Sequence, residues 1–111
     1  MTYQLIYTSA GTPNVTEDDL LGIVKSATRN NRAVGITGVL LFFDGNILQV
    51  LEGEKSVVKD AFQRIKKDSR HRDPMILIER FIEEREFPDW SMGFNALTED
   101  QASDFLFKLT G

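Results

Sequence analysis

Apolar and polar residues alternate along this chain with two different periods. A period of two, or a short run that is apolar throughout, is typical of β-strands, whereas recurrence at every third and fourth position is typical of an amphipathic helix. The strand pattern occurs at residues 3–9, 35–43, 47–51, 75–81 and 90–95. The helix pattern occurs at about residues 16–30, 55–69 and 98–109.

Turn and cap signals separate these segments. Residues 10–14 read Ala-Gly-Thr-Pro-Asn, which predicts a turn. The dipeptide Asp44-Gly45 lies between two apolar runs, and this arrangement favours a tight hairpin. Thr16 and Thr98 are each followed, three residues later, by Asp or Gln, a pattern that marks a helix N-terminus. The resulting order of elements is β-α-β-β-α-β-β-α.

This order predicts an α+β fold of the ferredoxin-like βαββαββ type. We expect a five-stranded mixed sheet with two helices on one face, a groove between those helices, and a C-terminal helix. Residues 1–96 are expected to form one domain. Residues 97–111 are expected to form the last helix, which either seals the sheet or carries an output.

Composition narrows the class of protein. The chain has 111 residues, no cysteine and a net charge of −4. A negative protein is a poor general binder of nucleic acid or anionic membranes, since these need a positive surface. The lack of cysteine excludes disulfides, zinc ribbons and thiolate nucleophiles. No apolar stretch approaches the roughly 20 residues of a membrane span, so we expect a cytoplasmic protein without membrane contact.

A buried amide is predicted in the third strand. Gln49 shares its face of the strand with Ile47 and Leu51, which form a core row. A buried amide without a partner costs about 1–3 kcal/mol, so a polar group must meet it. Tyr7 occupies the matching place in the first strand. The two side chains form either a structural hydrogen bond or part of a ligand site.

Two asparagines follow the apolar stripe of the first helix. Asn31 lies four residues beyond Ala27, and Asn30 lies seven beyond Ile23, so both amides are expected to point toward the groove. An amide offers a donor and an acceptor side by side, which suits a ring with alternating N–H and C=O groups. The alternative is a helix C-cap, where asparagine is common.

A basic group is crowded into nine residues of this acidic protein, at Arg64, Lys66, Lys67, Arg70, His71 and Arg72. Such a group can hold a phosphate through charge-assisted hydrogen bonds. It can equally be a solvated helix end that complements the helix dipole. His71 is the only histidine, and no carboxylate spacing assists it, so we expect no metal site.

Near the C-terminus, Trp90 and Met92 share one face of the fifth predicted strand. They either fill core space or contact a bound ring. The sequence contains no nucleophile elbow, P-loop or dinucleotide fingerprint. Hydrolase and kinase functions therefore have no support.

Taken in order, these motifs resemble the BLUF family, the blue-light sensors using flavin, from about residue 3 to residue 96. The matching segments are Leu5-Ile6-Tyr7-Thr8-Ser9, Asn30-Asn31, Gly35-Ile36-Thr37-Gly38-Val39-Leu40, Leu48-Gln49-Val50-Leu51-Glu52-Gly53, Asp68-Ser69-Arg70-His71 and Trp90-Ser91-Met92. Six segments in one order, with Tyr7 and Gln49 at the family's spacing, make the likeness specific.

The resemblance implies FAD between the two helices, with its ring toward the sheet. Tyr7 matches the family's photo-oxidisable tyrosine, and Gln49 matches the switching glutamine between that tyrosine and the flavin. Asn31 matches the asparagine that fixes the pyrimidine edge of the ring, and Asn30 matches its packed neighbour. The other implied contacts are the apolar walls and the groups near the phosphate tail: Ile23, Leu40 and Ile65 for the walls, and Arg64, Asp68, Arg70 and His71 for the tail.

The resemblance also implies a light sensor without turnover chemistry, and therefore not an enzyme. Excited flavin would oxidise Tyr7, Gln49 would relay the proton, and the amide would remain rotated or tautomerised, with a small red shift in absorption. Trp90 and Met92 would relay this change. The output is expected to reach a downstream protein partner or a fused effector, and we expect a homo-oligomer.

Two other classes use a ferredoxin-like fold. A small enzyme of the acylphosphatase type would need a phosphate-binding loop with an arginine after the first strand, and residues 10–14 contain no basic side chain. An RNA-recognition module would expose aromatic and basic residues on its central strands. Here those strands are mainly aliphatic, and the net charge is negative.

Overall fold

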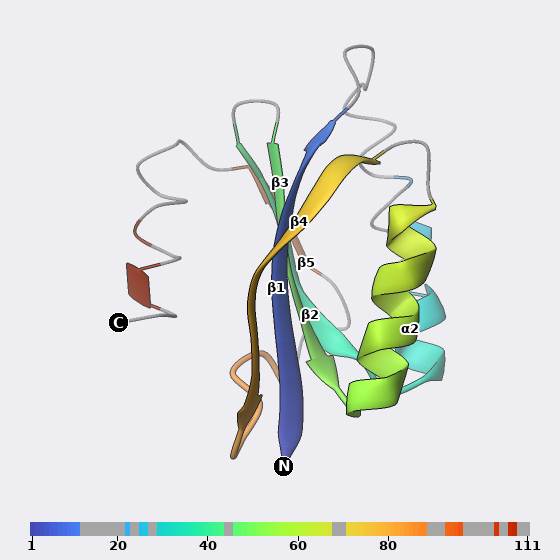
Figure 1. Ribbon diagram of the computed structural model, residues 1–111, viewed down its shortest axis with the longest axis vertical. Helices are drawn as coiled ribbons and strands as arrows, with labels where there is room; N and C mark the ends of the chain where they lie inside the picture. The colour runs from blue at the N-terminus through green and yellow to red at the C-terminus, as the bar shows by residue number, and fades with distance from the viewer. Residues whose placement is uncertain are drawn as a thin grey trace.

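The computed structural model describes residues 1–11, 22, 25, 26, 29–43, 46–67, 71–88, 93–96, 104, 107 and 108. Five strands and one complete helix lie in these ranges: β1 (Thr2–Gly11), β2 (Thr37–Phe43), β3 (Asn46–Gly53), α2 (Lys55–Lys66), β4 (His71–Ile82) and β5 (Gly93–Ala96). The first helix is described only in part, with residues 22, 25, 26 and 29–33 helical. Its described end lies on the same side of the sheet as α2 (Figure 1).

The strands form one sheet in the order β4-β1-β3-β2-β5. The pairs β1–β3, β1–β4 and β2–β3 are antiparallel, whereas β2 and β5 run parallel. β1, β3 and β2 are therefore interior strands, and β4 and β5 are the two edges. The predicted α+β class with two helices is confirmed, and four of the strands, β4, β1, β3 and β2, are antiparallel.

Both faces of the central strands are buried. One core lies between the sheet and α2; its members are Tyr3, Leu5, Tyr7, Ile36, Leu40, Ile47, Leu51, Val58, Ala61 and Phe62. A second, smaller core covers the opposite face and consists of Ile6, Val39, Leu41, Leu48 and Val50, with Ile78 and Phe87 packed against it. Because successive side chains of a strand point to opposite faces, odd-numbered residues of β1 and β3 belong to the first core and even-numbered residues to the second.

The predicted apolar stripe of α2 is confirmed. Val58, Ala61 and Phe62 are buried, and Ile65 is partly buried against the same core. The helix ends at Lys66, three residues before the predicted end, and the backbone N–H of Lys67 returns to the carbonyl of Arg64 at 3.2 Å. Two basic side chains in its last turn, Arg64 and Lys66, complement the negative end of the helix dipole.

Strand boundaries differ from the prediction where pairing overrides local pattern. β4 begins at His71 instead of residue 75, because β1 continues far enough to pair Ala10 with Arg72 and Gly11 with His71. β2 begins at Thr37 instead of residue 35, because a turn at Gly35 (φ 75°) precedes it. The predicted strand at 90–95 is observed as Gly93–Ala96, and residues 90–92 lie outside the described part of the chain.

The predicted C-terminal helix lies almost entirely outside the described residues. Within its range only Asp104, Phe107 and Lys108 are described, and these three are helical. The helix cap at Thr98 and the hairpin turn at 44–45 also lie outside them. Within the part of the chain that the structure describes, no helix has the length and apolar character to cross a bilayer.

Candidate functional site

Tyr7 and Gln49 face each other across β1 and β3 on the side of the sheet that α2 covers. They are direct register partners in the antiparallel pair. The side chain of Tyr7 is fully buried, and that of Gln49 is 2% exposed. The phenolic O–H of Tyr7 donates a hydrogen bond to Oε1 of Gln49. The predicted convergence of the two groups on one face is therefore observed.

Apolar groups enclose this pair. Leu40 of β2 is the register partner of Gln49 on its other side and is fully buried. The ring of Phe62 on α2 stands edge-on to that of Tyr7, with the centroids 5.2 Å apart. Such surroundings lower the local dielectric, which strengthens a hydrogen bond and raises the cost of leaving its groups unpaired.

The chemistry available to the pair follows from the amide. A glutamine side chain carries a carbonyl that accepts and an NH2 group that donates, so rotation exchanges the two roles at one point in space. In this structure the carbonyl of Gln49 meets the phenol. A change in the phenol's charge or proton would therefore change which orientation of the amide is favoured.

The structure separates the two asparagines that the helical stripe grouped together. Asn31 is buried, at 4% exposed. Its backbone carbonyl accepts hydrogen bonds from the backbone N–H groups of Val34 and Ile36 in the turn before β2. Asn30, by contrast, is exposed. Adjacent helical residues lie about 100° apart around the axis, and burial supports an inward position for Asn31 but not for Asn30.

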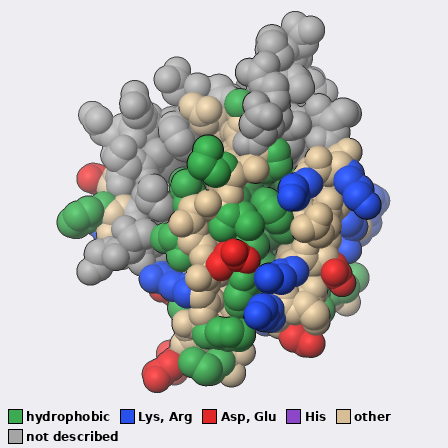
Figure 2. Space-filling view, in the orientation of Figure 1, with side chains coloured by type: hydrophobic (Ala, Val, Ile, Leu, Met, Phe, Trp, Pro, Cys, Tyr) green, Lys and Arg blue, Asp and Glu red, His purple; other side chains and the backbone are tan. Residues whose placement is uncertain are grey.

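Only some of the remaining predicted site residues belong to the described part of the chain. Leu40 is fully buried and Ile65 half-buried, as apolar walls should be, while Ile23 lies outside the described residues. Arg64 is exposed on the last turn of α2, and the exposed basic side chains of this helix gather on one side of the molecule (Figure 2). Asp68 and Arg70 lie outside the described residues, as do Trp90 and Met92.

The basic group is not a single helix end. His71 and Arg72 belong to the start of β4, whereas Arg64 and Lys66 end α2. The side chain of His71 is not described. Among the described residues, no group of three histidine, aspartate or glutamate side chains is placed to hold a metal ion.

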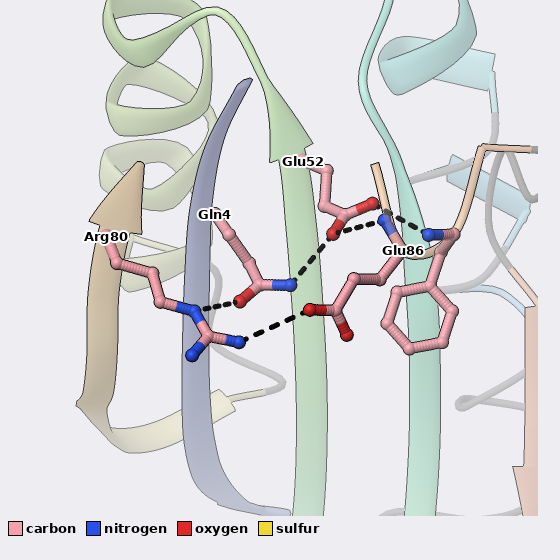
Figure 3. A network of polar contacts seen from close by, with 5 residues as sticks. Gln4, Glu52, Arg80 and Glu86 are labelled. Atoms are coloured by element: carbon pink, nitrogen blue, oxygen red, sulfur yellow. Dashed lines mark hydrogen bonds and ion pairs between the residues drawn. The ribbon is translucent and has the colours of Figure 1, made fainter. Parts of the chain in front are cut away.

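Sequence reasoning missed a second buried polar group, on the opposite face of the same strands. Gln4 and Glu52 are both fully buried, and Nε2 of Gln4 donates to Oε2 of Glu52 at 2.8 Å. The signal that identified Gln49 also applies here, because Gln4 shares a row with Ile6, and Glu52 shares one with Val50. Figure 3 shows the polar network to which this pair belongs.

The other tyrosine of the chain has an ionic partner. Tyr3 is 4% exposed, and its O–H donates to Oε1 of Glu79 at 2.5 Å. Burial raises the pKa of Tyr3 from 10.0 to about 12, and the hydrogen bond and negative charge of Glu79 act in the same direction. Lys55 at the start of α2 lies 5.8 Å from the centre of the Tyr3 ring.

This pKa predicts a loss of stability in strong alkali. Because the folded pKa of Tyr3 is raised, its contribution to stability is complete below about pH 10 and is lost as the pH rises through about 12. The chain has two tyrosines, so a Tyr7→Phe variant leaves the ultraviolet tyrosinate signal to Tyr3 alone. We expect its midpoint well above 10 in the folded protein, and lower in a further Glu79→Gln variant. A midpoint at the ordinary value would contradict the assignment.

Comparison with known proteins places this geometry in context. Residues 2–93 match the family model described as BLUF, sensors of blue-light using FAD. Photoactivated adenylate cyclase subunit beta of Euglena longa is 34% identical over 102 residues, which cover 91% of this chain and 12% of that protein. The corresponding subunit of Euglena gracilis is 35% identical over 102 residues, with the same coverage. This chain thus spans only a small part of the length of these relatives.

Solved structures show the same fold. A bacterial light-regulated adenylyl cyclase superposes with a TM-score of 0.86 at 31% identity, covering 99% of this chain and 34% of that one. BlsA in its photo-activated state gives 0.86 at 34% identity, covering 97% and 79%. BlrB, a BLUF protein in its dark state, gives 0.82 at 28% identity, covering 97% and 80%. These comparisons favour neither an acylphosphatase-like enzyme nor an RNA-recognition module.

Proposed function

The chain belongs to the BLUF family of blue-light sensors, and on this premise we propose that it binds FAD between the first helix and α2, with Tyr7 and Gln49 as its photoactive pair. The observation that carries the proposal is the hydrogen bond from Tyr7 to Gln49 on the helix-covered face. A buried phenol and a buried amide in contact, inside an apolar enclosure, supply the groups that such a sensor needs.

The described residues are compatible with a flavin ring. Three buried polar side chains, Tyr7, Asn31 and Gln49, belong to elements on or facing the helix-covered side of the sheet. Amides of this kind complement the alternating donors and acceptors of a pyrimidine edge. We assign Asn31 to that edge, with Asn30 as its neighbour. Leu40, Ile65 and Ile23 would form the walls, and Arg64, Asp68, Arg70 and His71 would lie near the phosphate tail.

The proposed photochemistry uses the chain's own hydrogen bonds. Bound flavin supplies a strong oxidant when it absorbs blue light. Tyr7 would give up an electron to that oxidant, and its phenolic proton, then much more acidic, would move along the hydrogen bond to Oε1 of Gln49. When the charges recombine, the electron and a proton would return to Tyr7, while the Gln49 amide would stay rotated or tautomerised and present a donor where it had presented an acceptor. No bond between heavy atoms would form or break, and the net redox state would be unchanged.

The output side of the sensor is assigned to the far end of the chain. We infer that residues 1–96 form the flavin domain, with β5 as the fifth strand of its sheet, and that residues 97–111 form a C-terminal helix. Trp90 and Met92 would relay the change from Gln49 to this helix. The adenylate cyclases among the relatives extend far beyond the matching part, which supports a downstream protein partner or a fused effector. The sensor itself would be a cytoplasmic homo-oligomer without turnover chemistry of its own.

The proposal is tested by the bound pigment. Protein purified in the dark should release FAD on denaturation, as identified by chromatography against FMN and riboflavin. Its absorption should shift to the red under blue light and return in the dark. We expect Asn31→Ala to weaken FAD binding roughly tenfold or more, because a buried hydrogen-bonding partner is lost.

The exposed neighbour provides the matched control, since Asn30→Ala should weaken FAD binding less than Asn31→Ala. Colourless protein that takes up no flavin would contradict the proposal, as would bound FAD without a reversible red shift.

A further inference from the structure

A second buried polar pair joins the two strands that carry Tyr7 and Gln49, on the face away from α2. Gln4 and Glu52 are register partners in the β1–β3 pair, and both are fully buried. They stand three residues from Tyr7 and Gln49 on their respective strands. Because three is an odd number, the two pairs point to opposite faces of the sheet. A change in the position of β3 would therefore alter side-chain contacts on both faces of the sheet.

The carboxylate of Glu52 also holds a segment outside the sheet. The backbone N–H of Phe87 donates to Oε1 of Glu52 at 2.8 Å, and the backbone N–H of Glu86 donates to Oε2 at 3.1 Å. Arg85, from the same segment, donates to the Thr37 hydroxyl at 2.8 Å and to the backbone carbonyl of Glu52 at 3.4 Å. Thr37 is itself the β2 register partner of Glu52. One position on β3 thus fixes three consecutive residues.

Glu52 also belongs to a ring of polar contacts, which Figure 3 shows. Its members are Glu52, Gln4, Arg80 and Glu86. Nε of Arg80, on β4, donates to Oε1 of Gln4 at 2.8 Å. This bond orients the Gln4 amide so that its NH2 group meets Glu52. Arg80 also lies 3.4 Å from the carboxylate of Glu86. The two 2.8 Å bonds of the Gln4 side chain each involve a charged group and are strong, so they resist local displacement of this amide, whereas the longer, partly exposed Arg80–Glu86 pair contributes less.

Residues 85–87, which Glu52 holds, lie in the sequence between β4 and β5, the two edge strands of the sheet. β4 ends at Ile82 on one edge, and β5 begins at Gly93 on the other. Phe87 packs against the second core, beside the strands that flank Gln49. Close-packed side chains transmit small displacements because they cannot absorb them. Movement of β3 would therefore be passed to residues 85–87.

We propose that Glu52 is a positioning residue that couples the hydrogen-bond change at Gln49 to residues 85–87. The inference rests on the proposed function, because it needs a light-driven change at Gln49. In this arrangement the helix-covered face of β3 receives the signal, and the Glu52 carboxylate on its other face transmits it.

The test follows amide hydrogen exchange in the flavin-loaded protein, in the dark and under continuous blue light. We expect light to raise the exchange of the Glu86 and Phe87 amides about tenfold, which corresponds to weakening one bond to a charged acceptor. A Gln49→Leu variant should show no light-dependent change at these amides. The red shift, recorded on the same samples, reports the photochemistry separately.

Glu52→Gln tests the carboxylate itself, because it keeps the shape but replaces one acceptor oxygen with an NH2 group. We expect a red shift of normal size, faster exchange at Glu86 and Phe87 in the dark, and no further increase in light. Glu84→Gln removes the same charge from an exposed side chain of the same loop, and should behave as the unaltered protein does.

The outcomes are distinct. A normal red shift without light-dependent exchange at Glu86 and Phe87 in the unaltered protein would overturn the coupling alone, and so would a full light response in Glu52→Gln. If Glu52→Gln does not fold, the unaltered protein and Gln49→Leu still test the coupling at the two amides that the Glu52 carboxylate accepts, and it is overturned if light changes their exchange equally in both. Absence of any red shift in the unaltered protein would overturn the proposed function and the coupling together.

Discussion

Replacing Gln49 with leucine is expected to abolish the red-shifted state while FAD remains bound. Leucine is close in size and suits the apolar row of Ile47 and Leu51, so the fold should survive. It cannot accept the phenolic hydrogen bond of Tyr7 or present a donor after rotation. The expected light-minus-dark difference at the edge of the flavin band is therefore zero, against a clear shift in the unaltered protein.

A matched control is available on α2, where Gln63 is exposed. Gln63→Leu makes the same chemical change away from Tyr7 and should leave the red shift intact. The buried phenol in Gln49→Leu loses its acceptor, so this variant should also unfold more easily, by about 1–3 kcal/mol. A reversible red shift of normal size in Gln49→Leu would show that another group switches the hydrogen bond.

Gly38→Ala is expected to cost more stability than the same methyl addition at Gly53. A Cβ built on Gly38 would lie 1.8 Å from the backbone carbonyl oxygen of Val50 and 2.8 Å from its carbon. Gly38 pairs with Leu51 in the β2–β3 ladder, so relief requires the two strands to separate next to Gln49. We expect a loss of about 3 kcal/mol or more in the free energy of unfolding.

Urea denaturation of the flavin-loaded protein, followed by circular dichroism at saturating FAD, measures this loss. Gly53→Ala is the control, because its Cβ would meet its nearest neighbour, the Gly35 carbonyl, at 3.4 Å, an ordinary contact. A Gly38→Ala protein as stable as Gly53→Ala would mean that β2 and β3 are held further apart than described.

The central pair was predictable because its logic is local. A buried amide in an apolar row of a strand needs a polar partner. The alternation of side chains along the strand determines which face of the sheet the amide occupies. The register that places Tyr7 directly opposite Gln49 was not predictable in the same way, since it depends on the hairpin and on how β1 enters the sheet. Family resemblance supplied that spacing in advance.

Long-range pairing explains what the local pattern failed to predict. Nothing in the residues around His71 signals a strand; they join β4 because β1 offers them unpaired backbone. Local pattern does not predict the burial of Glu52, since a glutamate is rarely buried without partners. Its partners are Gln4, 48 residues earlier, and two backbone amides more than 30 residues later. Partners so far from Glu52 in the sequence cannot be predicted from the residues around it.

Gln4 and Gln49, the glutamines that are buried in the described part of the chain, have contrasting surroundings with a spectroscopic consequence. Gln4 is bracketed by a guanidinium and a carboxylate, so its carbonyl and NH2 ends cannot trade places without setting like against like. Gln49 meets an uncharged phenol, for which inversion is far less costly. In infrared spectra of protein carrying isotope-labelled glutamine, one buried carbonyl band should therefore move on illumination while the other stays stationary as a built-in reference.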